Sequence, residues 1–456
     1  MLPAPSTGSP TTLPALRSSP SGALAGQVRV PGDKSISHRS LMLGALAEGE
    51  TVIDGLLEGE DVLRTAMAMR LLGATATRDA DGRWRVAGRG VGALSEPDDV
   101  LDMGNAGTGA RLVMGLLAGH KLTACLTGDA SLRRRPMARV AAPLTKMGAE
   151  IVAREGCRLP LCLRGTATPQ PIDYRLPVPS AQVKSAILLA GLTASGTTTV
   201  IEPEPTRDHT ELMLRHFGAA ISVTPGRNGE RRVALAGRPR LTARAVAVPA
   251  DPSSAAFPLV AALLRPGSAV TLLDVGLNPH RIGLIETLRE MGAEIAIVRR
   301  RETAGEPVGD LEVGGGPLTA VTVPAGRAPS MIDEYPILAV AASCARGTTV
   351  MHGLAELRVK ESDRLAAIAG GLAACGVAVE AGPDSLAVTG TGEPPAGGAT
   401  IATGLDHRIA MAFLVLGMAA RRPVAIDDSA PIDTSFPGFA PLMNRLGAAI
   451  EPVEPA

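Results

Sequence analysis

The clearest pattern in the chain is a set of six segments that are rich in Ala, Leu and Gly and apolar on nearly every face. Such segments predict helices that are buried on all sides, whereas a surface helix has one apolar face. They span residues 34–49, 105–119, 180–196, 251–267, 333–347 and 406 to about 422. Strand-like runs such as "TTTVIEP" and "TTVMHG" follow most of them, which indicates an α/β protein.

A second series of segments alternates with the first. Each of these segments is amphipathic and ends in Gly, and the spacing between successive glycines is 70 to 84 residues. One such segment predicts only a helix that a left-handed Gly terminates, but six at nearly constant spacing indicate a repeated unit. The glycines are Gly73, Gly148, Gly218, Gly292, Gly376 and Gly447.

The 456 residues are too many for one ordinary hydrophobic core, and six units divide most simply into two domains of three. Turn-forming polar residues precede a buried helix at "PGDKS" and "PADPSS", where we expect the chain to cross between domains. One domain would then be 34–250, and the other 251–456 completed by 27–33. Residues 1–26 hold one charge and few large apolar side chains, so we expect a disordered leader. The cleft between the domains is the expected ligand site.

Composition excludes several classes of function. Lys plus Arg equals Asp plus Glu at 45 each, so no overall field attracts nucleic acid or an anionic membrane, and aromatic residues at 2% leave little to stack bases. No apolar stretch reaches membrane-spanning length and no signal peptide is evident, so we expect a cytoplasmic protein without membrane partners. Its five cysteines, odd in number and without metal-binding spacing, suit reduced thiols in a reducing compartment. We expect no metal or other cofactor.

Charged and hydroxyl side chains gather at the starts of the buried helices and in nearby loops. Helix N-termini carry free N–H groups and partial positive charge, so several that face one cleft would bind an anion. Arg offers two donors to a carboxylate or phosphate, and Lys offers a compact charge. The expected ligand is therefore small and carries several negative charges. The helix starts hold Lys34, Ser35, Ser37, Arg39, Asn105, Gly107, Thr108, Arg111, Ser180, Gln182, Asp251, Ser253, Asp333, Glu334, Asp406, His407 and Arg408, and the loops are "RRRPM" with Arg135, "TRDH" with Arg207, and "RVKESDR" with Lys360, Glu361 and Arg364.

Each motif also has a simpler interpretation when it is taken alone. "KSISHR" is typical of a helix cap with solvated charges, and "RVKESDR" of an exposed helix face. "GNAGTGAR" resembles a phosphate loop but lacks the Lys-Ser/Thr of a P-loop. Asp333 and Glu361 suit an acid and a base of different pKa, but they are equally suited to capping helices.

Seven motifs in this order resemble the EPSP synthase family: "PGDKSISHRS", "GNAGTG", "RPMARV", "SAQVKSA", "DEYPILAVAA", "RVKESDR" and "DHRIAM". The resemblance runs from about residue 26 to 450, and "TRDHTE" and "DPSSAAFPLVAALL" are similar to its class II bacterial subgroup. It implies two domains, each an inside-out α/β barrel of three repeats, which agrees with the count of six units.

The resemblance also implies an activity without a metal or cofactor. The family transfers the enolpyruvyl group of phosphoenolpyruvate to the 5-hydroxyl of shikimate 3-phosphate, through a tetrahedral intermediate, and releases phosphate. Asp333 would take the hydroxyl proton, Glu361 would transfer protons at the methylene carbon, and Lys34 would contact both substrates. The shikimate 3-phosphate residues would be Lys34, Ser35, Arg39, Ser180, Gln182, Arg207, Asp333 and Lys360. The phosphoenolpyruvate residues would be Lys34, Asn105, Gly107, Arg135, Gln182, Arg364 and Arg408.

Two positions need separate comment. Many family members have a Lys where "DTSFP" places Thr434, so the resemblance carries no phosphoenolpyruvate contact to that position. Gly107 stands where an Ala narrows the pocket in glyphosate-insensitive relatives, which implies glyphosate sensitivity here. The cations and carboxylates come from both expected domains, so the site should be complete only when the domains close. We expect a monomer that binds two small molecules.

Two other functions remain open from the sequence. The related transferase that acts on UDP-N-acetylglucosamine typically uses a loop Cys, and the corresponding region "DASLRRRPM" has none. A non-catalytic anion-binding protein could be built from the same repeats, although the presence of both Asp333 and Glu361 argues against it.

Overall fold

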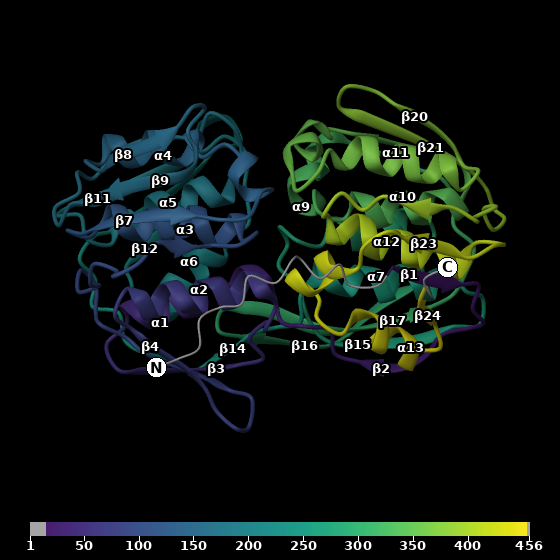
Figure 1. Cartoon of the computed structure of the whole chain (residues 1–456), viewed down its shortest axis with the longest axis horizontal. Helices are drawn as coiled ribbons and strands as arrows, with labels where there is room; N and C mark the ends of the chain where they lie inside the picture. Colours follow the sequence, from purple (N-terminus) through teal and green to yellow (C-terminus); the bar gives the residue numbers. More distant parts are fainter. Residues whose placement is uncertain (1–14, 454–456) are drawn as a thin grey trace.

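The computed structural model describes residues 15–453, which fold into two lobes that lie side by side (Figure 1). Each lobe has its own cluster of buried apolar side chains. One cluster runs from Ile36 to Val248, and the other takes Leu24, Val28 and Val30 together with residues from Ala250 to Ile450. We call residues 34–248 the first lobe, and residues 15–33 with 249–453 the second lobe.

The strands of residues 15–453 form six four-stranded sheets that share one design. In each sheet a short edge strand runs parallel to the second strand, and the other two strands are antiparallel to their neighbours. The first-lobe sheets are β14 (Val246–Ala247), β3 (Glu50–Asp54), β5 (Trp84–Ala87), β4 (Thr75–Arg78); β6 (Leu101–Asp102), β7 (Thr123–Thr127), β9 (Arg158–Arg164), β8 (Glu150–Arg154); and β10 (Asp173–Arg175), β11 (Thr197–Glu202), β13 (Arg231–Ala236), β12 (Ile221–Pro225).

The second lobe repeats this design with one change in chain order. Its first two sheets are β2 (Ala25–Val28), β15 (Ala269–Gly276), β17 (Glu306–Gly314), β16 (Ile295–Thr303); and β18 (Thr322–Val323), β19 (Arg346–His352), β21 (Ser385–Thr391), β20 (Ala378–Ala381). The last sheet is β22 (Thr400–Ile401), β23 (Val424–Ile426), β1 (Leu16–Ser19) and β24 (Ala449–Pro452). In the other five sheets the third strand comes later in the chain than the second strand. In the last sheet the third strand is β1, which comes from the N-terminal part of the chain.

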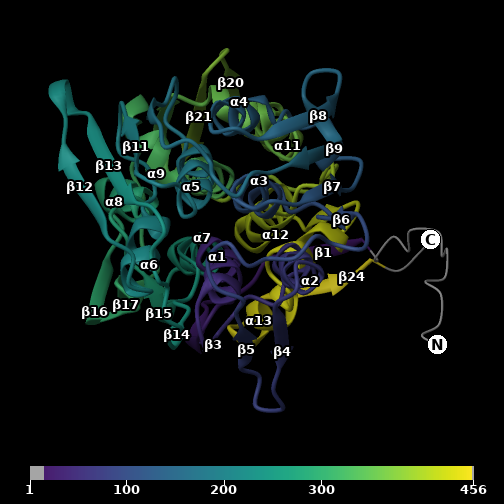
Figure 2. The same ribbon diagram turned by 90° about the vertical axis from the view of Figure 1, so that its left-hand side faces the viewer.

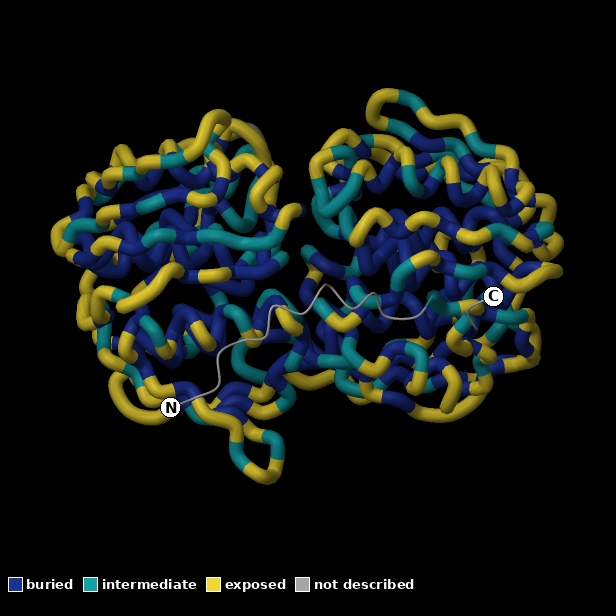
Figure 3. The backbone as a smooth tube through the Cα atoms, in the orientation of Figure 1, coloured by how far each residue is buried: buried dark blue, intermediate teal, exposed yellow. Residues whose placement is uncertain are grey.

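The six predicted buried helices are present and lie inside the sheets. They are α1 (Lys34–Leu46), α3 (Gly107–Ala118) and α5 (Ala181–Gly191) in the first lobe, and α7 (Pro252–Leu263), α10 (Tyr335–Cys344) and α12 (His407–Ala419) in the second. Figure 2 shows strands β12 and β13 at the outer edge with α5 inside them, and Figure 3 shows that burial is concentrated in the lobe interiors. Small residues let these helices approach closely: a Cβ on Gly115 of α3 would lie 2.4 Å from the carbonyl oxygen of Ala186 in α5.

The predicted amphipathic helices are also confirmed. They are α2 (Glu60–Leu71), α4 (Ala138–Lys146), α6 (His209–His216), α8 (Gly283–Glu290), α11 (Arg364–Ala374) and α13 (Phe439–Arg445), while α9 (Ala328–Met331) is a single additional turn. All six glycines that follow them have positive φ, from 80° at Gly376 to 109° at Gly447, as a left-handed termination requires. Among residues 15–453, no helix combines the length and the apolar character needed to cross a membrane.

The predicted crossings "PGDKS" and "PADPSS" lie against each other at the junction of the lobes. The N–H of Asp33 donates to the carbonyl of Pro249 at 2.8 Å, and the N–H of Asp251 donates to the carbonyl of Pro31 at 2.9 Å. Gly32 and Ala250 form an antiparallel bridge between these two bonds. We call residues 31–33 and 249–251 the crossing segments.

The expectation of a disordered leader at residues 1–26 is wrong for its second part. Leu16–Ser19 pairs with both β23 and β24, and Ala25–Val28 pairs with β15. The segment has few large apolar side chains of its own, but its backbone forms hydrogen bonds with strands of two sheets that come from later in the chain. Residues 1–14 lie outside the described residues.

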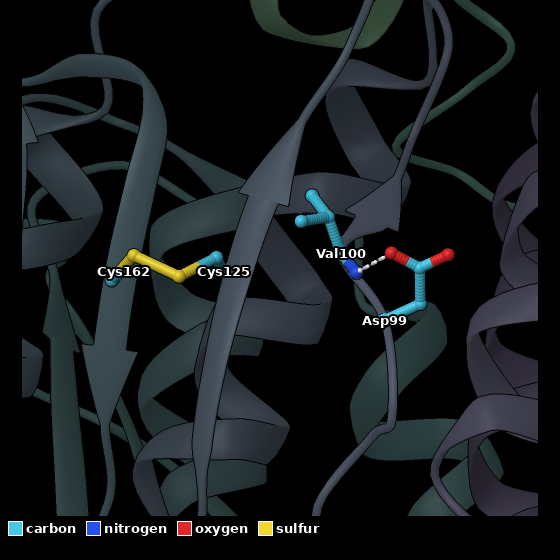
Figure 4. Close-up of a disulfide and its surroundings, with 4 residues drawn as sticks. All are labelled: Asp99, Val100, Cys125 and Cys162. Atoms are coloured by element: carbon cyan, nitrogen blue, oxygen red, sulfur yellow. Dashed lines mark hydrogen bonds between the residues drawn. A yellow bond between two sulfur atoms is a disulfide. The ribbon is translucent and has the colours of Figure 1, made fainter.

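The expectation that all five cysteines are reduced is also wrong. Cys125 of β7 and Cys162 of β9 face each other in the antiparallel register and form a disulfide with the two Cα atoms 4.0 Å apart (Figure 4). The two positions are 37 residues apart in the chain, so only strand pairing brings them together. Cys157, Cys344 and Cys375 are free.

We predict that Cys125→Ala lowers the free energy of unfolding by about 3 to 4 kcal/mol without reductant, because the bond restricts the unfolded chain. Urea unfolding measures this loss, and Cys157→Ala is the control for removing a thiol that forms no bond. Thiol titration of the denatured protein should give three thiols before reduction and five after it. Five thiols before reduction would contradict the pairing.

Candidate functional site

A cavity of about 550 Å³ lies between the lobes and is lined by both of them. That volume suits small ligands. Eleven of the fourteen residues that the family resemblance assigns to the site line it. From the first lobe these are Lys34, Ser35, Gly107, Arg135, Ser180, Gln182 and Arg207, and from the second lobe Asp333, Lys360, Glu361 and Arg408.

The remaining three candidates lie behind the cavity wall and contact residues that line it. Arg39 is buried and donates from Nη1 to the carbonyl of Ser35 at 2.8 Å. Asn105 accepts from Nη2 of Arg135 at 2.5 Å. Arg364 is also buried and contacts Asp333 and Glu361. In this structure these side chains orient the wall rather than form it.

Helix starts supply much of the wall, as the sequence pattern predicts. Lys34 begins α1, whose N-cap Asp33 accepts from the N–H of Ile36. Ser180 caps α5 by accepting from the N–H of Val183, which places Gln182 in the first turn. Gly107 begins α3, and a Cβ at this position would lie 2.8 Å from Nη1 of Arg135. A side chain there would therefore displace an arginine of the wall.

Asp333 lies at the centre of the cations. Its carboxylate contacts Arg207 at 2.8 Å and Lys360 and Arg364 at 3.2 Å each, and its carbonyl accepts from Arg408 at 3.1 Å. Burial alone would raise the pKa of Asp333, but these cations hold the pKa well below its usual range. The carboxylate is therefore ionised. Because Arg207 belongs to the first lobe, this ion pair also joins the lobes.

Glu361 forms a second anionic centre beside Asp333. Arg364 contacts its carboxylate at 2.5 Å and Arg135 of the first lobe at 3.8 Å. Burial opposes ionisation, but these two arginines hold the pKa of Glu361 well below its usual range. The carbonyl of Glu361 also accepts from the hydroxyl of Ser131 at 3.3 Å, a further contact between the lobes.

Lys34 is paired with a residue that the sequence analysis did not select. Asp61, at the start of α2, lies 2.9 Å from the Lys34 ammonium, and burial raises the pKa of Asp61. The two positions are 27 residues apart, and "EGED" carries no recognisable signal. His407 also lines the cavity. Its burial, and to a smaller extent the nearby charge of Lys34, hold the pKa of His407 well below the usual range, so this imidazole is neutral.

Arg111, one of the polar residues at the predicted helix starts, and Arg281 also line the cavity, although the family resemblance assigned neither of them to a substrate. Arg111 donates to Gln182 at 3.0 Å, and burial together with the neighbouring Arg135 lowers its pKa to about 10. Arg281 lies in a turn with no sequence signal. Thr434, by contrast, is absent from the cavity wall, and its hydroxyl donates to the carbonyl of Pro431 at 2.6 Å.

The arrangement fits a polyanionic ligand better than a metal. Among residues 15–453, no cluster of His, Cys, Asp and Glu side chains could hold a metal ion. Several guanidinium and ammonium groups instead converge on one cavity with two ionised carboxylates, which provides charge stabilisation and two candidates for proton transfer.

Comparisons with known proteins agree on one family. The EPSP synthase (3-phosphoshikimate 1-carboxyvinyltransferase) family profile matches residues 18–443. A 3-phosphoshikimate 1-carboxyvinyltransferase of Rhodospirillum rubrum is 66% identical over 445 residues, covering 97% of this chain and 98% of that protein. One of Methylorubrum extorquens is 62% identical over 435 residues, covering 95% of this chain and 96% of the other.

A solved structure gives the same result in three dimensions. An EPSP synthase of Acinetobacter baumannii superposes with a TM-score of 0.86 at 43% identity, covering 97% of this chain and all of that one. The sequence and structure matches both extend over nearly the whole length, so neither rests on one shared motif or one lobe. The chain belongs to the EPSP synthase (3-phosphoshikimate 1-carboxyvinyltransferase) family.

Proposed function

We propose that this protein transfers the enolpyruvyl group of phosphoenolpyruvate to the 5-hydroxyl of shikimate 3-phosphate and releases phosphate. The observation that carries the proposal is the pair of ionised carboxylates, Asp333 and Glu361, inside a cavity walled by cations from both lobes. Each substrate carries a phosphate and a carboxylate, so the two together need several fixed cations. Family membership points to the same reaction.

Lys34, Arg135 and Arg408 have the charge and position to bind phosphoenolpyruvate beside Gly107 and Gln182. Arg207 and Lys360 are placed to bind shikimate 3-phosphate, with Ser35 and Ser180 as hydroxyl donors. All seven of these side chains, together with Gln182, line the cavity. Asn105, Arg364 and Arg39 would act from behind the wall unless closure moves them inward. These assignments rest on position, charge and the family motifs.

Ligand anions should raise the basicity of the two carboxylates. In the free site Asp333 and Glu361 share their cations, and so their pKa values are too low for an effective base or acid. When phosphate and carboxylate groups of the substrates contact the same cations, each protein carboxylate loses stabilisation of its ionised form, and its pKa rises. Substrate binding would thus bring both groups toward the range in which protons can transfer.

The 5-hydroxyl oxygen bonds to C2 of phosphoenolpyruvate while Asp333 takes the hydroxyl proton and Glu361, in its protonated form, protonates C3. The product is a tetrahedral ketal phosphate. Glu361 then removes a proton from C3 as the bond between C2 and the phosphate oxygen breaks, and the departing phosphate receives the proton held by Asp333. Lys34 and Arg135 would stabilise the charge on that phosphate.

We also propose that the lobes are domains that close on the ligands. Only the two crossing segments continue the chain between the lobes within the described residues, and the cavity wall is divided between the lobes. The ion pairs Arg207–Asp333, at 2.8 Å, and Arg139–Glu356, at 3.0 Å, already span the gap. Substrate anions inserted among these groups would replace repulsion between cations with bridging contacts and exclude water.

We propose that the protein is a monomer in the cytoplasm, where the Cys125–Cys162 disulfide would be an exception to the reduced cysteines that are usual in that compartment. Both sides of the cavity come from one chain, so no second copy is needed to complete it. Substrates with several charges do not cross a bilayer unaided, and the enzyme should therefore occupy the compartment in which they are made.

Phosphate release tests the reaction directly. Purified protein should release phosphate from phosphoenolpyruvate when shikimate 3-phosphate is present, and should not do so with UDP-N-acetylglucosamine or with neither acceptor. A phosphate-detection assay with the three mixtures distinguishes the proposal from its two alternatives. Release with UDP-N-acetylglucosamine would support the related transferase, and no release in any mixture would leave only anion binding.

Asp333→Asn should lower kcat by about 100-fold or more, the usual contribution of a general acid or base. It should also make the free protein less stable, because the cations around position 333 lose their shared negative charge. Added inorganic phosphate should therefore raise the Tm of the variant more than that of the wild type. Asp173→Asn, which alters an exposed ion pair with Arg232, is the control. Full activity in Asp333→Asn would exclude Asp333 as the base.

Glyphosate should inhibit competitively with phosphoenolpyruvate, because Gly107 leaves space beside Arg135. Gly107→Ala should displace that guanidinium and weaken glyphosate inhibition by about tenfold or more, which corresponds to about 1.4 kcal/mol, with a smaller rise in KM for phosphoenolpyruvate. Initial rates at several concentrations of both compounds measure these effects. Gly370→Ala is the control, since nothing lies within 4 Å of a Cβ there. Unchanged wild-type turnover in a large excess of glyphosate would contradict the expectation.

A further inference from the structure

A buried arginine joins the two crossing segments through their helix caps. Arg281 is 4% exposed. Its Nη1 donates to Oδ2 of Asp33 and its Nη2 to Oδ1 of Asp251, at 2.9 Å each. Asp33 is the N-cap of α1 in the first lobe, and Asp251 is the N-cap of α7 in the second. One guanidinium thus fixes the first turns of two helices that belong to different lobes.

On the first-lobe side the contacts lead directly to Lys34. The N–H of Lys34 donates to Oδ2 of Asp251 at 3.0 Å, so this backbone is held by the cap of the opposite lobe. The same aspartate accepts from Arg281 through its other oxygen. The position of Lys34 therefore depends on a carboxylate whose own orientation is set by Arg281.

On the second-lobe side the contacts lead to Asp333 and Arg408. Nη2 of Arg281 donates to the hydroxyl of Ser253 at 2.8 Å, and that hydroxyl donates to Oε1 of Glu334. Glu334 is buried and directly follows Asp333 in the sequence. Its Oε1 lies 3.5 Å from Nη1 of Arg408. A continuous chain of polar contacts thus connects the junction of the lobes with both walls of the cavity.

We propose that Arg281 is a positioning residue that holds Lys34 of the first lobe in register with Asp333 and Arg408 of the second. The inference rests on the proposed function, since it concerns alignment for that reaction. A single guanidinium suits this role because its donors form a rigid planar fork that can bind two carboxylates and a hydroxyl together. A lysine offers one compact charge on a flexible chain and cannot hold both caps in the same geometry.

The position of Arg281 predicts an unequal effect on the two substrates, whereas a residue that only supports the fold would affect both equally. Displacing a reacting group by about 1 Å can cost about 100-fold in rate. Arg408 is assigned to phosphoenolpyruvate alone, whereas Lys34 is assigned to both substrates. Ser180, which is assigned to shikimate 3-phosphate alone, caps α5 and is not one of the residues that the contacts of Arg281 connect. Loss of Arg281 should thus affect the reaction with phosphoenolpyruvate far more than binding of shikimate 3-phosphate.

The test uses the full-length enzyme and three variants. Arg281→Lys should lower kcat/KM for phosphoenolpyruvate by about 100-fold, while the Kd for shikimate 3-phosphate, measured by calorimetry without phosphoenolpyruvate, should change less than about threefold. Ser253→Ala removes only the link to Glu334 and should raise KM for phosphoenolpyruvate with both caps still bound. Arg17→Lys is the control, because Arg17 pairs with exposed Glu451 in the sheet of β1 and β24 and does not line the cavity.

The outcomes separate this inference from the proposed function. If wild-type protein releases no phosphate with the two substrates, the proposed function fails. If the wild type is active and Arg281→Lys keeps its kcat/KM, or loses affinity for both substrates equally, the positioning role is wrong. If Arg281→Lys does not fold, Ser253→Ala decides: a raised KM with unchanged shikimate 3-phosphate affinity supports the role, and wild-type kinetics overturns it.

Discussion

The site depends on keeping many positive charges close together inside a folded protein. Guanidinium and ammonium groups crowded into one cavity repel each other and lose hydration, and either effect would spread them apart. Asp333 and Glu361 counter this repulsion, because each contacts cations of both lobes. The same carboxylates are the groups assigned to proton transfer. Asp333 and Glu361 therefore stabilise the empty site and are also the proposed reactive groups when the site is filled.

This double use gives a physical reason for binding and catalysis to be linked. In the free protein the cations suppress the basicity of both carboxylates. In the proposed mechanism a ligand with several negative charges would compete for those cations, and its binding would both fill the cavity and raise the basicity of the carboxylates. An uncharged molecule of similar size would do neither. A preference for small ligands with several negative charges thus follows from electrostatics before any detail of shape is considered.

The fold places these charges by repeating one unit six times. Each buried helix points its first turn toward the junction side of its lobe, so caps and first-turn side chains from α1, α5, α7 and α12 meet near one cavity. The sixth unit is closed by the N-terminal strand β1. Each crossing segment ends in an aspartate that caps the next helix, and a single arginine binds both aspartates. Hydrogen bonds therefore connect the crossing segments with the residues of the cavity wall, in addition to the direct connection along the chain.

Much of this was accessible from the sequence because it is encoded locally. The apolar helices, the terminating glycines and the motif residues at helix starts depend on neighbours within a few positions, and the structure contains each of them. Eleven of the fourteen residues assigned through the family motifs line the cavity, and those at helix starts do so because helix N-termini on equivalent edges of repeated units converge. That the remaining Arg39, Asn105 and Arg364 stand behind the wall could not be foreseen, because side-chain reach depends on packing.

The tertiary structure alone decided whatever requires residues distant in the chain to meet. Nothing near Asp61 marks it as the partner of Lys34, and Arg281 lies in an ordinary turn about 30 residues from the cap that it binds at Asp251. The pairing of Cys125 with Cys162 follows from strand register, and residues 16–19 and 25–28 form strands by pairing with strands from later in the chain. The sequence by itself determined the repeats, their helix starts and the kind of charge gathered there. Long-range packing determined which charges touch, because ion pairing depends on distance in space and leaves no periodic pattern along the chain.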